Sequence, residues 1–185
     1  MRLILLTVVV AVIVGLVTGG SLRAFPSIPL RWWWLAVAGV VLQLLPGQGA
    51  IAVVLLFVSF GLLLVFGVVN VRVAGFPLIL VGLALNALVI GVNRGMPVTR
   101  GALSSSGQQD ALAELASNGD GQKHFLALGD TPLLFLGDVV PVPQPIGQAV
   151  SIGDVLVHVG VGWFIVMAMH PRRQPAVPET DPAKG

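Results

Sequence analysis

The first 109 residues contain no aspartate or glutamate, and Met1–Val92 divides into four long apolar blocks separated by short breaks that carry Arg, Pro or Gly. A soluble fold needs a polar surface, and about a quarter of the residues in an ordinary globular domain are charged. Here 10% of the residues are charged and 56% are hydrophobic. This pattern predicts that the chain lies in a lipid bilayer.

A membrane-spanning helix needs about 20 mainly apolar residues, with about 17 as the lower limit. The candidate spans are Leu3–Thr18, Trp32–Leu45, Ile51–Val69, Gly75–Val92 and Ile152–Met169. The first also fits a secretory signal, because Arg2 precedes it and small residues follow it. The second is short, but its three leading tryptophans can lie at the headgroup level and complete the span. We therefore predict an all-α, polytopic membrane helical bundle of about five transmembrane helices, forming one domain over residues 1–170.

The distribution of Arg and Lys predicts the orientation, because cytoplasmic loops carry more of them. With the N-terminus outside, the inner face collects most of the arginines. The inner ones are Arg23, Arg31, Arg72, Arg172 and Arg173, and the outer ones are Arg2, Arg94 and Arg100. The prediction is a multi-pass protein with its N-terminus outside the cell and its C-terminus in the cytoplasm. The proline-rich tail, residues 171–185, is predicted to be a disordered cytoplasmic segment.

One connection, residues 93–151, is long enough to have its own structure, and the predicted orientation places it outside the cell. Ser106–Gln109 fits a capping box before apolar residues at helical spacing, so we predict a short amphipathic helix over about 108–117. Thr131–Pro145 is apolar but is interrupted by Asp138 and ends in three prolines. It is expected to form a re-entrant or interfacial segment over the outer ends of the helices, because it is too short and too broken to span.

Several classes of protein are excluded by what the chain lacks. There is no cysteine, so thiol chemistry and disulfides are absent. The net charge is +2, but the basic residues are scattered, and this argues against nucleic-acid binding. No nucleotide-binding, hydrolase or metalloprotease motif occurs, and we predict no cofactor.

Seven polar residues form a candidate pocket on the extracytoplasmic side. They are Gln43, Asn86, Lys123, His124, Asp138, Asp154 and His158. Asp154 and His158 are four residues apart on the last span and therefore share a helix face. We predict that this face points into the bundle, where at least one of Asn86, Gln43, His124 or Asp138 contacts it, because an ionisable group facing lipid is costly.

Structural roles compete with each of these functional interpretations. Gln43 and Asn86 fit simple hydrogen bonds between helices. Ser151 and Asp154 fit a capping box at the start of the last span, and His158 fits a hydrogen bond within the bundle as well as a titrating group. His and Asp are suitable metal ligands, but only distant spacing supports such a site, and no metal is predicted.

Three stretches of the chain resemble a known family. They are Asn93–Val98 (NRGMPV), Lys123–His124, and Leu136–Pro141 (LGDVVP) continuing to Val150–Val155 (VSIGDV). Together they resemble DUF5317, a bacterial family of small integral membrane proteins with no assigned activity. The resemblance covers about Gly15–Gly162. It implies an integral protein of a bacterial cell membrane and transfers no catalytic residue.

We expect a non-enzymatic role, in which the protein binds or organises a membrane lipid, another membrane protein or a second copy of itself. One alternative is a homo-oligomeric transporter or channel, which would need polar residues through the inner halves of the helices. Another is a membrane enzyme acting on a lipid headgroup. That activity would need His124, Asp138, Asp154 or His158 to lie within hydrogen-bond reach of one another.

Overall fold

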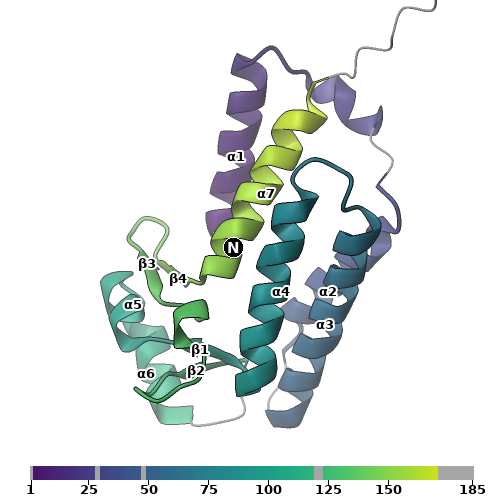
Figure 1. Ribbon diagram of the computed structural model, residues 1–185. Helices are drawn as coiled ribbons and strands as arrows, with labels where there is room; N and C mark the ends of the chain where they lie inside the picture. Colours follow the sequence, from purple (N-terminus) through teal and green to yellow (C-terminus); the bar gives the residue numbers. More distant parts are fainter. Residues whose placement is uncertain (1, 28–29, 47–48, 119–122, 171–185) are drawn as a thin grey trace, which may run out of the picture.

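The computed structural model describes residues 2–27, 30–46, 49–118 and 123–170. Within these ranges, five long helices stand side by side, and a compact unit lies next to them (Figure 1). The helices are α1 (Arg2–Val17), α2 (Trp33–Leu44), α3 (Gly49–Val69), α4 (Phe76–Asn93) and α7 (Ile152–Ala168). The bounds of each helix agree to within two residues with a predicted span, because each apolar stretch ends at Gly, Pro or a polar residue. The predicted disordered tail lies outside the described residues.

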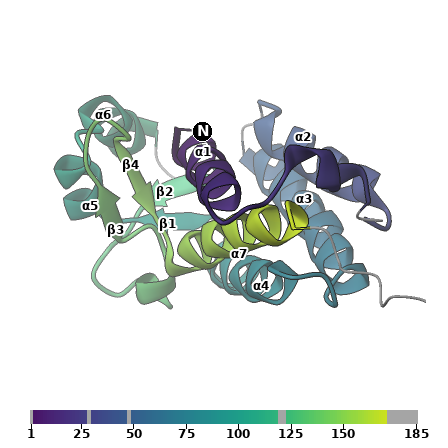
Figure 2. The ribbon, with the colours of Figure 1, turned by 90° about the horizontal axis from the view of Figure 1, so that it is seen from above.

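The order of the helices in space is α1, α7, α4, α3, α2 (Figure 2). The last helix of the chain therefore packs between the first and the fourth. The α4–α7 contact is the most extensive, and α2 packs on α3. Within the described residues, α1 has substantial helix packing with α7 alone.

Glycines bring α4 and α7 into close backbone contact. A Cβ atom added to Gly82 would collide with the carbonyl oxygen of Gly153, and one added to Gly160 would lie 2.7 Å from the carbonyl oxygen of Gly75. Small residues permit such close approach between membrane helices as well as in soluble cores. The same device recurs where Gly15 of α1 meets the side chain of Met169.

Successive helices run in opposite directions, so their connections lie at two ends of the bundle. At one end, a 3₁₀ helix (Leu22–Ser27) follows α1. There the amide nitrogen of Ser21 donates to the carbonyl oxygen of Met169 at 2.7 Å. Asn70 joins the α3–α4 turn to Arg31, since its Oδ1 accepts from the Arg31 N–H and its Nδ2 donates to the Arg31 carbonyl oxygen. The compact unit closes the other end.

The compact unit, residues 94–151, is here called the loop unit. Its elements are β1 (Met96–Val98), α5 (Arg100–Ser105), α6 (Gln109–Asn118), β2 (His124–Leu126), the 3₁₀ helix η2 (Leu134–Leu136), β3 (Val140–Val142) and β4 (Gln148–Val150). β1 pairs with β2 in parallel, and β3 pairs with β4 antiparallel. The unit lies beside the end of α4 and below α1 and α7 in Figure 1, with Leu136 buried in the same core cluster as α4 residues.

The helices expose much of their apolar surface. Ten of the 16 residues of α1 are large apolar side chains that remain exposed. In the described residues, α3 and α4 are long and apolar enough to cross a membrane, whereas α1, α2 and α7 are apolar but shorter. All five predicted spans are therefore present as apolar helices, but only two of these helices, among the described residues, are long enough to span a membrane. These two helices suggest membrane association.

The loop unit differs from the sequence-based expectation in three respects. The amphipathic helix is present as α6, but the predicted capping box is wrong. Ser106 instead ends α5, a helix that was not predicted, and its hydroxyl donates to the carbonyl oxygen of Leu103 and to the Gln108 side chain. The short strands β1–β4 were not predicted either. Thr131–Pro145 contains η2 and β3 and no continuous helix.

Candidate functional site

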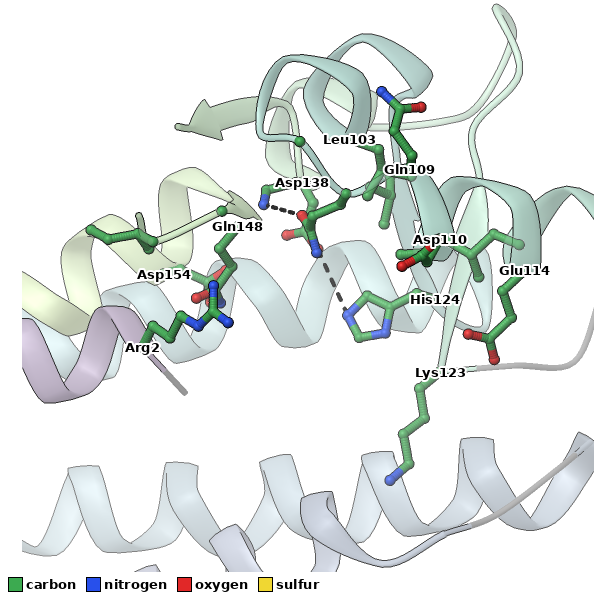
Figure 3. Close-up of a pocket in the computed structure, with 18 of the residues that line it drawn as sticks. Arg2, Leu103, Gln109, Asp110, Glu114, Lys123, His124, Asp138, Gln148 and Asp154 are labelled. Atoms are coloured by element: carbon green, nitrogen blue, oxygen red, sulfur yellow. Dashed lines mark hydrogen bonds and ion pairs between the residues drawn. The ribbon is translucent and has the colours of Figure 1, made fainter. Parts of the chain in front are cut away.

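A cavity of about 920 Å³ lies between the loop unit and the adjacent ends of α1, α2 and α7 (Figure 3). Side chains of both charge signs line it. The titratable lining residues are Arg2, Asp110, Glu114, Lys123, His124, Asp138 and Asp154. Elements from distant parts of the sequence therefore meet at one chamber, and its volume is in the range typical of small-ligand sites.

Asp138 is the most deeply buried acidic group of the cavity wall. Its amide nitrogen donates to the carbonyl oxygen of Pro97 at 2.9 Å and its carbonyl oxygen accepts from Thr99 at 3.3 Å, which holds it beside β1. The side chain is 9% exposed, and its Oδ1 has no hydrogen-bond partner in the described part of the chain. Burial, together with the charge of Asp154, raises the pKa of Asp138 to about 8. The carboxyl group is therefore mainly protonated at neutral pH.

β1 brings His124 and Asp138 together, because Met96 pairs with His124 of β2 and Val98 forms a bridge with Asp138. The distance from His124 Nε2 to Asp138 Oδ2 is 3.7 Å, which is longer than a hydrogen bond. The ring is 53% exposed, but it lines the cavity with protein around it, so it is still partly removed from bulk water. This burial lowers the pKa of His124, opposed by the charge of Asp154 and assisted by that of Lys123. The ring is neutral at pH 7.

The two cations of the cavity wall are already engaged by backbone carbonyls. Lys123 Nζ donates to the carbonyl oxygens of Gln43 at 2.6 Å and Leu45 at 2.7 Å, at the negative end of α2. Arg2 Nη1 donates to the carbonyl oxygen of Pro145 at 3.2 Å. In Figure 3, the Lys123 side chain extends away from the other labelled residues. Lys123 therefore connects the loop unit to α2.

Asp154 lies at the start of α7 and joins that helix to α4. Asn86 Nδ2 donates to Asp154 Oδ1 at 2.7 Å, and the Ser151 hydroxyl donates to Asn86 Oδ1 at 2.9 Å. Ser151 and Asp154 also form a capping box, in which the Asp154 N–H donates to Ser151 Oγ and the Ser151 N–H donates to Asp154 Oδ2. The capping role and the interhelical contact predicted for these residues are therefore both present.

The remaining predicted pocket residues divide between the cavity and its surroundings. Lys123, His124, Asp138 and Asp154 line it, and Asn86 adjoins it through Asp154. Gln43 contributes a backbone carbonyl, while its side chain is not among the lining groups. His158 is also outside the lining. Its Nδ1 lies 2.7 Å from the backbone carbonyl oxygen of Asp154, one turn earlier in α7, which is the kind of hydrogen bond within the bundle that was weighed as its structural role.

Sequence reasoning missed several lining residues. Asp110 and Glu114 are four residues apart on α6, a spacing that already placed them on one helix face. Gln108 had no such signal. Its Oε1 accepts from the Ser106 hydroxyl at 3.0 Å and from the Ala149 N–H at 2.8 Å, which joins α5 to β4. This contact depends on residues 41 positions apart.

The fold and the cavity define a mostly helical protein with an apolar five-helix row and a polar chamber under a compact loop unit. Residues 27–166 match the model of a family of unknown function, DUF5317. The chain belongs to that family. It is also 30% identical over 168 residues to an uncharacterised protein of Thermotoga maritima, covering 89% of this chain and 90% of that protein. No solved structure matches the chain.

Proposed function

We propose that the chain is a five-span membrane protein of the cell membrane, with the loop unit outside the cell, and that its cavity binds the polar headgroup of a membrane lipid. The observation that carries this proposal is the position of the cavity. A polar chamber lies directly at the ends of helices whose flanks are covered with exposed apolar side chains. A lipid has the same two parts, a polar headgroup that fits the chamber and apolar chains that fit the flanks of the helices.

The exposed apolar surface supports a lipid environment. In α3 and in α4, only 33% of the most apolar 18-residue stretch is buried. A core helix of a soluble protein would be mostly buried. α1, with 16 residues, is about 24 Å long at 1.5 Å per residue, against about 30 Å of hydrocarbon. Local thinning and interfacial anchors accommodate such a mismatch. Trp33 and Trp34, 62% and 56% exposed at the start of α2, are suitable anchors.

The rim of the cavity supports lipid as the ligand. Leu45 lines the cavity and is 42% exposed, and the adjacent Leu44 is 59% exposed, so the apolar surface of α2 continues to the rim. Arg2 lies in the same lining and uses one terminal nitrogen on Pro145. Its other N–H groups would serve a lipid phosphate, since guanidinium groups bind phosphate well.

Two rival functions receive less support. Transport through one subunit would need a polar path in the opposite half, where Phe76 packs edge-to-face on Phe66 and Phe164 at centroid distances of 5.3 and 5.6 Å. Catalysis by His124 and Asp138 would need an approach of about 2.6–3.2 Å for proton transfer, and the two side chains are 3.7 Å apart. Binding is therefore the favoured role.

Cysteine labelling tests the membrane topology directly, because the chain contains no cysteine of its own. Ser104→Cys places a thiol on the exposed surface of α5, and Val71→Cys places one in the exposed α3–α4 turn. In intact cells, a membrane-impermeant maleimide should label the first variant and not the second. Both should react after permeabilisation. If only Val71→Cys is labelled in intact cells, the orientation in the membrane is the opposite of the one proposed. Labelling of both variants in intact cells would refute the five-span arrangement.

Phospholipid retention tests the binding role. Ala111 lines the cavity from α6, whereas Ala113 lies on the exposed face of the same helix. Ala111→Trp should fill the chamber and remove most of the phospholipid that co-purifies in mild detergent, while Ala113→Trp should retain it. Phosphate analysis and native mass spectrometry measure the bound lipid. Equal retention by two variants of matching helicity and elution would count against a headgroup in this cavity.

A further inference from the structure

The cavity contains more acidic acceptor capacity than its own donors satisfy. Asp138 Oδ1 has no partner among the described residues, although the side chain is nine-tenths buried. Asp154 accepts one hydrogen bond on each carboxylate oxygen, and each oxygen has a second lone pair. A buried polar group without a partner is costly, and the residue that carries this one belongs to the lining of a ligand-sized chamber.

The cations present do not neutralise these carboxyl groups. Lys123 is directed at the end of α2, and Arg2 makes its hydrogen bond to Pro145. The structure contains no Lys–Asp or Arg–Asp ion pair among the described lining residues. Asp154 is close enough to influence both Asp138 and His124 electrostatically. The three groups therefore line the same cavity, and neither carboxyl group forms an ion pair with Lys or Arg among the described residues.

We propose that the cavity selects a primary ammonium group, such as the amine of an ethanolamine-type headgroup, and seats it between Asp138, Asp154 and the ring of His124. An ammonium has three N–H donors, and these residues offer two carboxyl groups and one ring nitrogen as acceptors. Charge-assisted hydrogen bonds of this kind are stronger than neutral ones. This inference rests on the proposed function, whose lipid supplies the amine, while Arg2 would contact the phosphate.

The lining also discriminates between kinds of cation. Quaternary ammonium groups such as choline are recognised by cages of aromatic rings. No Phe or Trp is found among the described lining residues of the cavity, and the chain has no Tyr. A site built of hydrogen-bond acceptors rejects an analogue that lacks the N–H groups, because the acceptors are then left unpaired. The ligand is therefore a primary amine and not choline.

The test measures melting temperature in detergent at pH 7 and constant ionic strength. The probes are ethanolamine, choline and ethylene glycol, which is a neutral analogue of ethanolamine. Ethanolamine should raise the melting temperature with saturation, and the other two should have little effect. Asp138→Asn should weaken the apparent affinity for ethanolamine about tenfold or more, because the Asp138 carboxyl group can give up its proton and become a charged acceptor when an ammonium binds beside it, whereas an amide cannot. Asp130→Asn, an exposed position in the same loop unit, should not.

A second measurement separates this inference from the proposed function. The protein is reconstituted with equal amounts of phosphatidylethanolamine and phosphatidylglycerol, re-extracted, and analysed for bound lipid. Preferential retention of phosphatidylethanolamine supports both claims. Retention of both lipids equally, or an equal response to choline and ethanolamine, overturns the amine preference while lipid binding stands. Ethanolamine binding that depends on Asp138, without any retained lipid, supports the amine site and overturns the lipid function.

Discussion

Replacing Gly82 or Gly160 by alanine is expected to destabilise the helix bundle strongly. The added methyl group at Gly82 meets the carbonyl oxygen of Gly153, and the one at Gly160 meets that of Gly75. Backbone atoms cannot rotate away as side-chain ends can, so α4 and α7 must separate. Overpacking of this kind costs roughly 1–3 kcal/mol and occasionally more. Thermal or denaturant unfolding in detergent, followed by circular dichroism, measures the loss.

Gly61 provides a matched control for this experiment. It lies within α3, and nothing is found within 4 Å of a Cβ atom placed there. Gly61→Ala should therefore leave stability unchanged or raise it slightly through the better helix propensity of alanine. If Gly82→Ala and Gly61→Ala unfold alike, the close α4–α7 contact is not what holds these helices together.

Asp138→Asn is expected to increase stability, and the increase should depend on pH. An unfolded Asp titrates near pH 3.9, whereas in the native state the pKa of Asp138 is raised to about 8. Between these values the native state keeps a proton that the unfolded state has lost, so the free energy of unfolding falls as pH rises and levels off above about pH 8. Between these two pH values the free energy of unfolding is expected to fall by on the order of a few kcal/mol because of this group. Asparagine does not titrate and should abolish this decline.

The difference between the wild type and Asp138→Asn isolates this effect from other titrating groups. The lowered pKa of His124 reduces stability as pH falls below about 6.5, but it does so in both proteins. The variant should be about as stable as the wild type near pH 4 and clearly more stable near pH 8.5, in amine-free buffer. Asp130→Asn should show no such trend. A pH-independent difference would mean that the buried carboxyl group is not protonated in the native state.

The five helices could be predicted because their information is local. A long apolar stretch in a nonpolar environment forms a helix, because only a helix satisfies all of its backbone hydrogen bonds within the segment. Gly, Pro or polar residues mark the ends of each stretch. The order of the helices in space could not be predicted this way. It follows from the glycine contacts between Gly82 and Gly153 and between Gly75 and Gly160, which join residues far apart in the sequence.

The candidate site was predictable only where a single energetic rule applied. The face that carries Asp154 was expected to contact at least one of four polar residues, because polar groups within an apolar bundle need partners. Asn86 was one of the four, and it does contact Asp154. The position of His124 opposite Asp138 depends on strands of three residues, which have no periodicity to detect. Arg2 was interpreted only as a topology signal or as the basic residue before a secretory signal. Its place in the cavity lining follows from the loop unit folding back to the start of α1.

The position of α7 between α1 and α4 has a consequence for the order of assembly during synthesis. α1 is made first, yet the only helix on which it packs substantially within the described residues is made last. A single helix forms all of its backbone hydrogen bonds internally, so α1 can remain stable in lipid before α7 is made. The bundle is therefore completed only when translation has passed Ala168. A chain truncated before Ile152 would leave α1 without its helix partner and the glycine face of α4 uncovered.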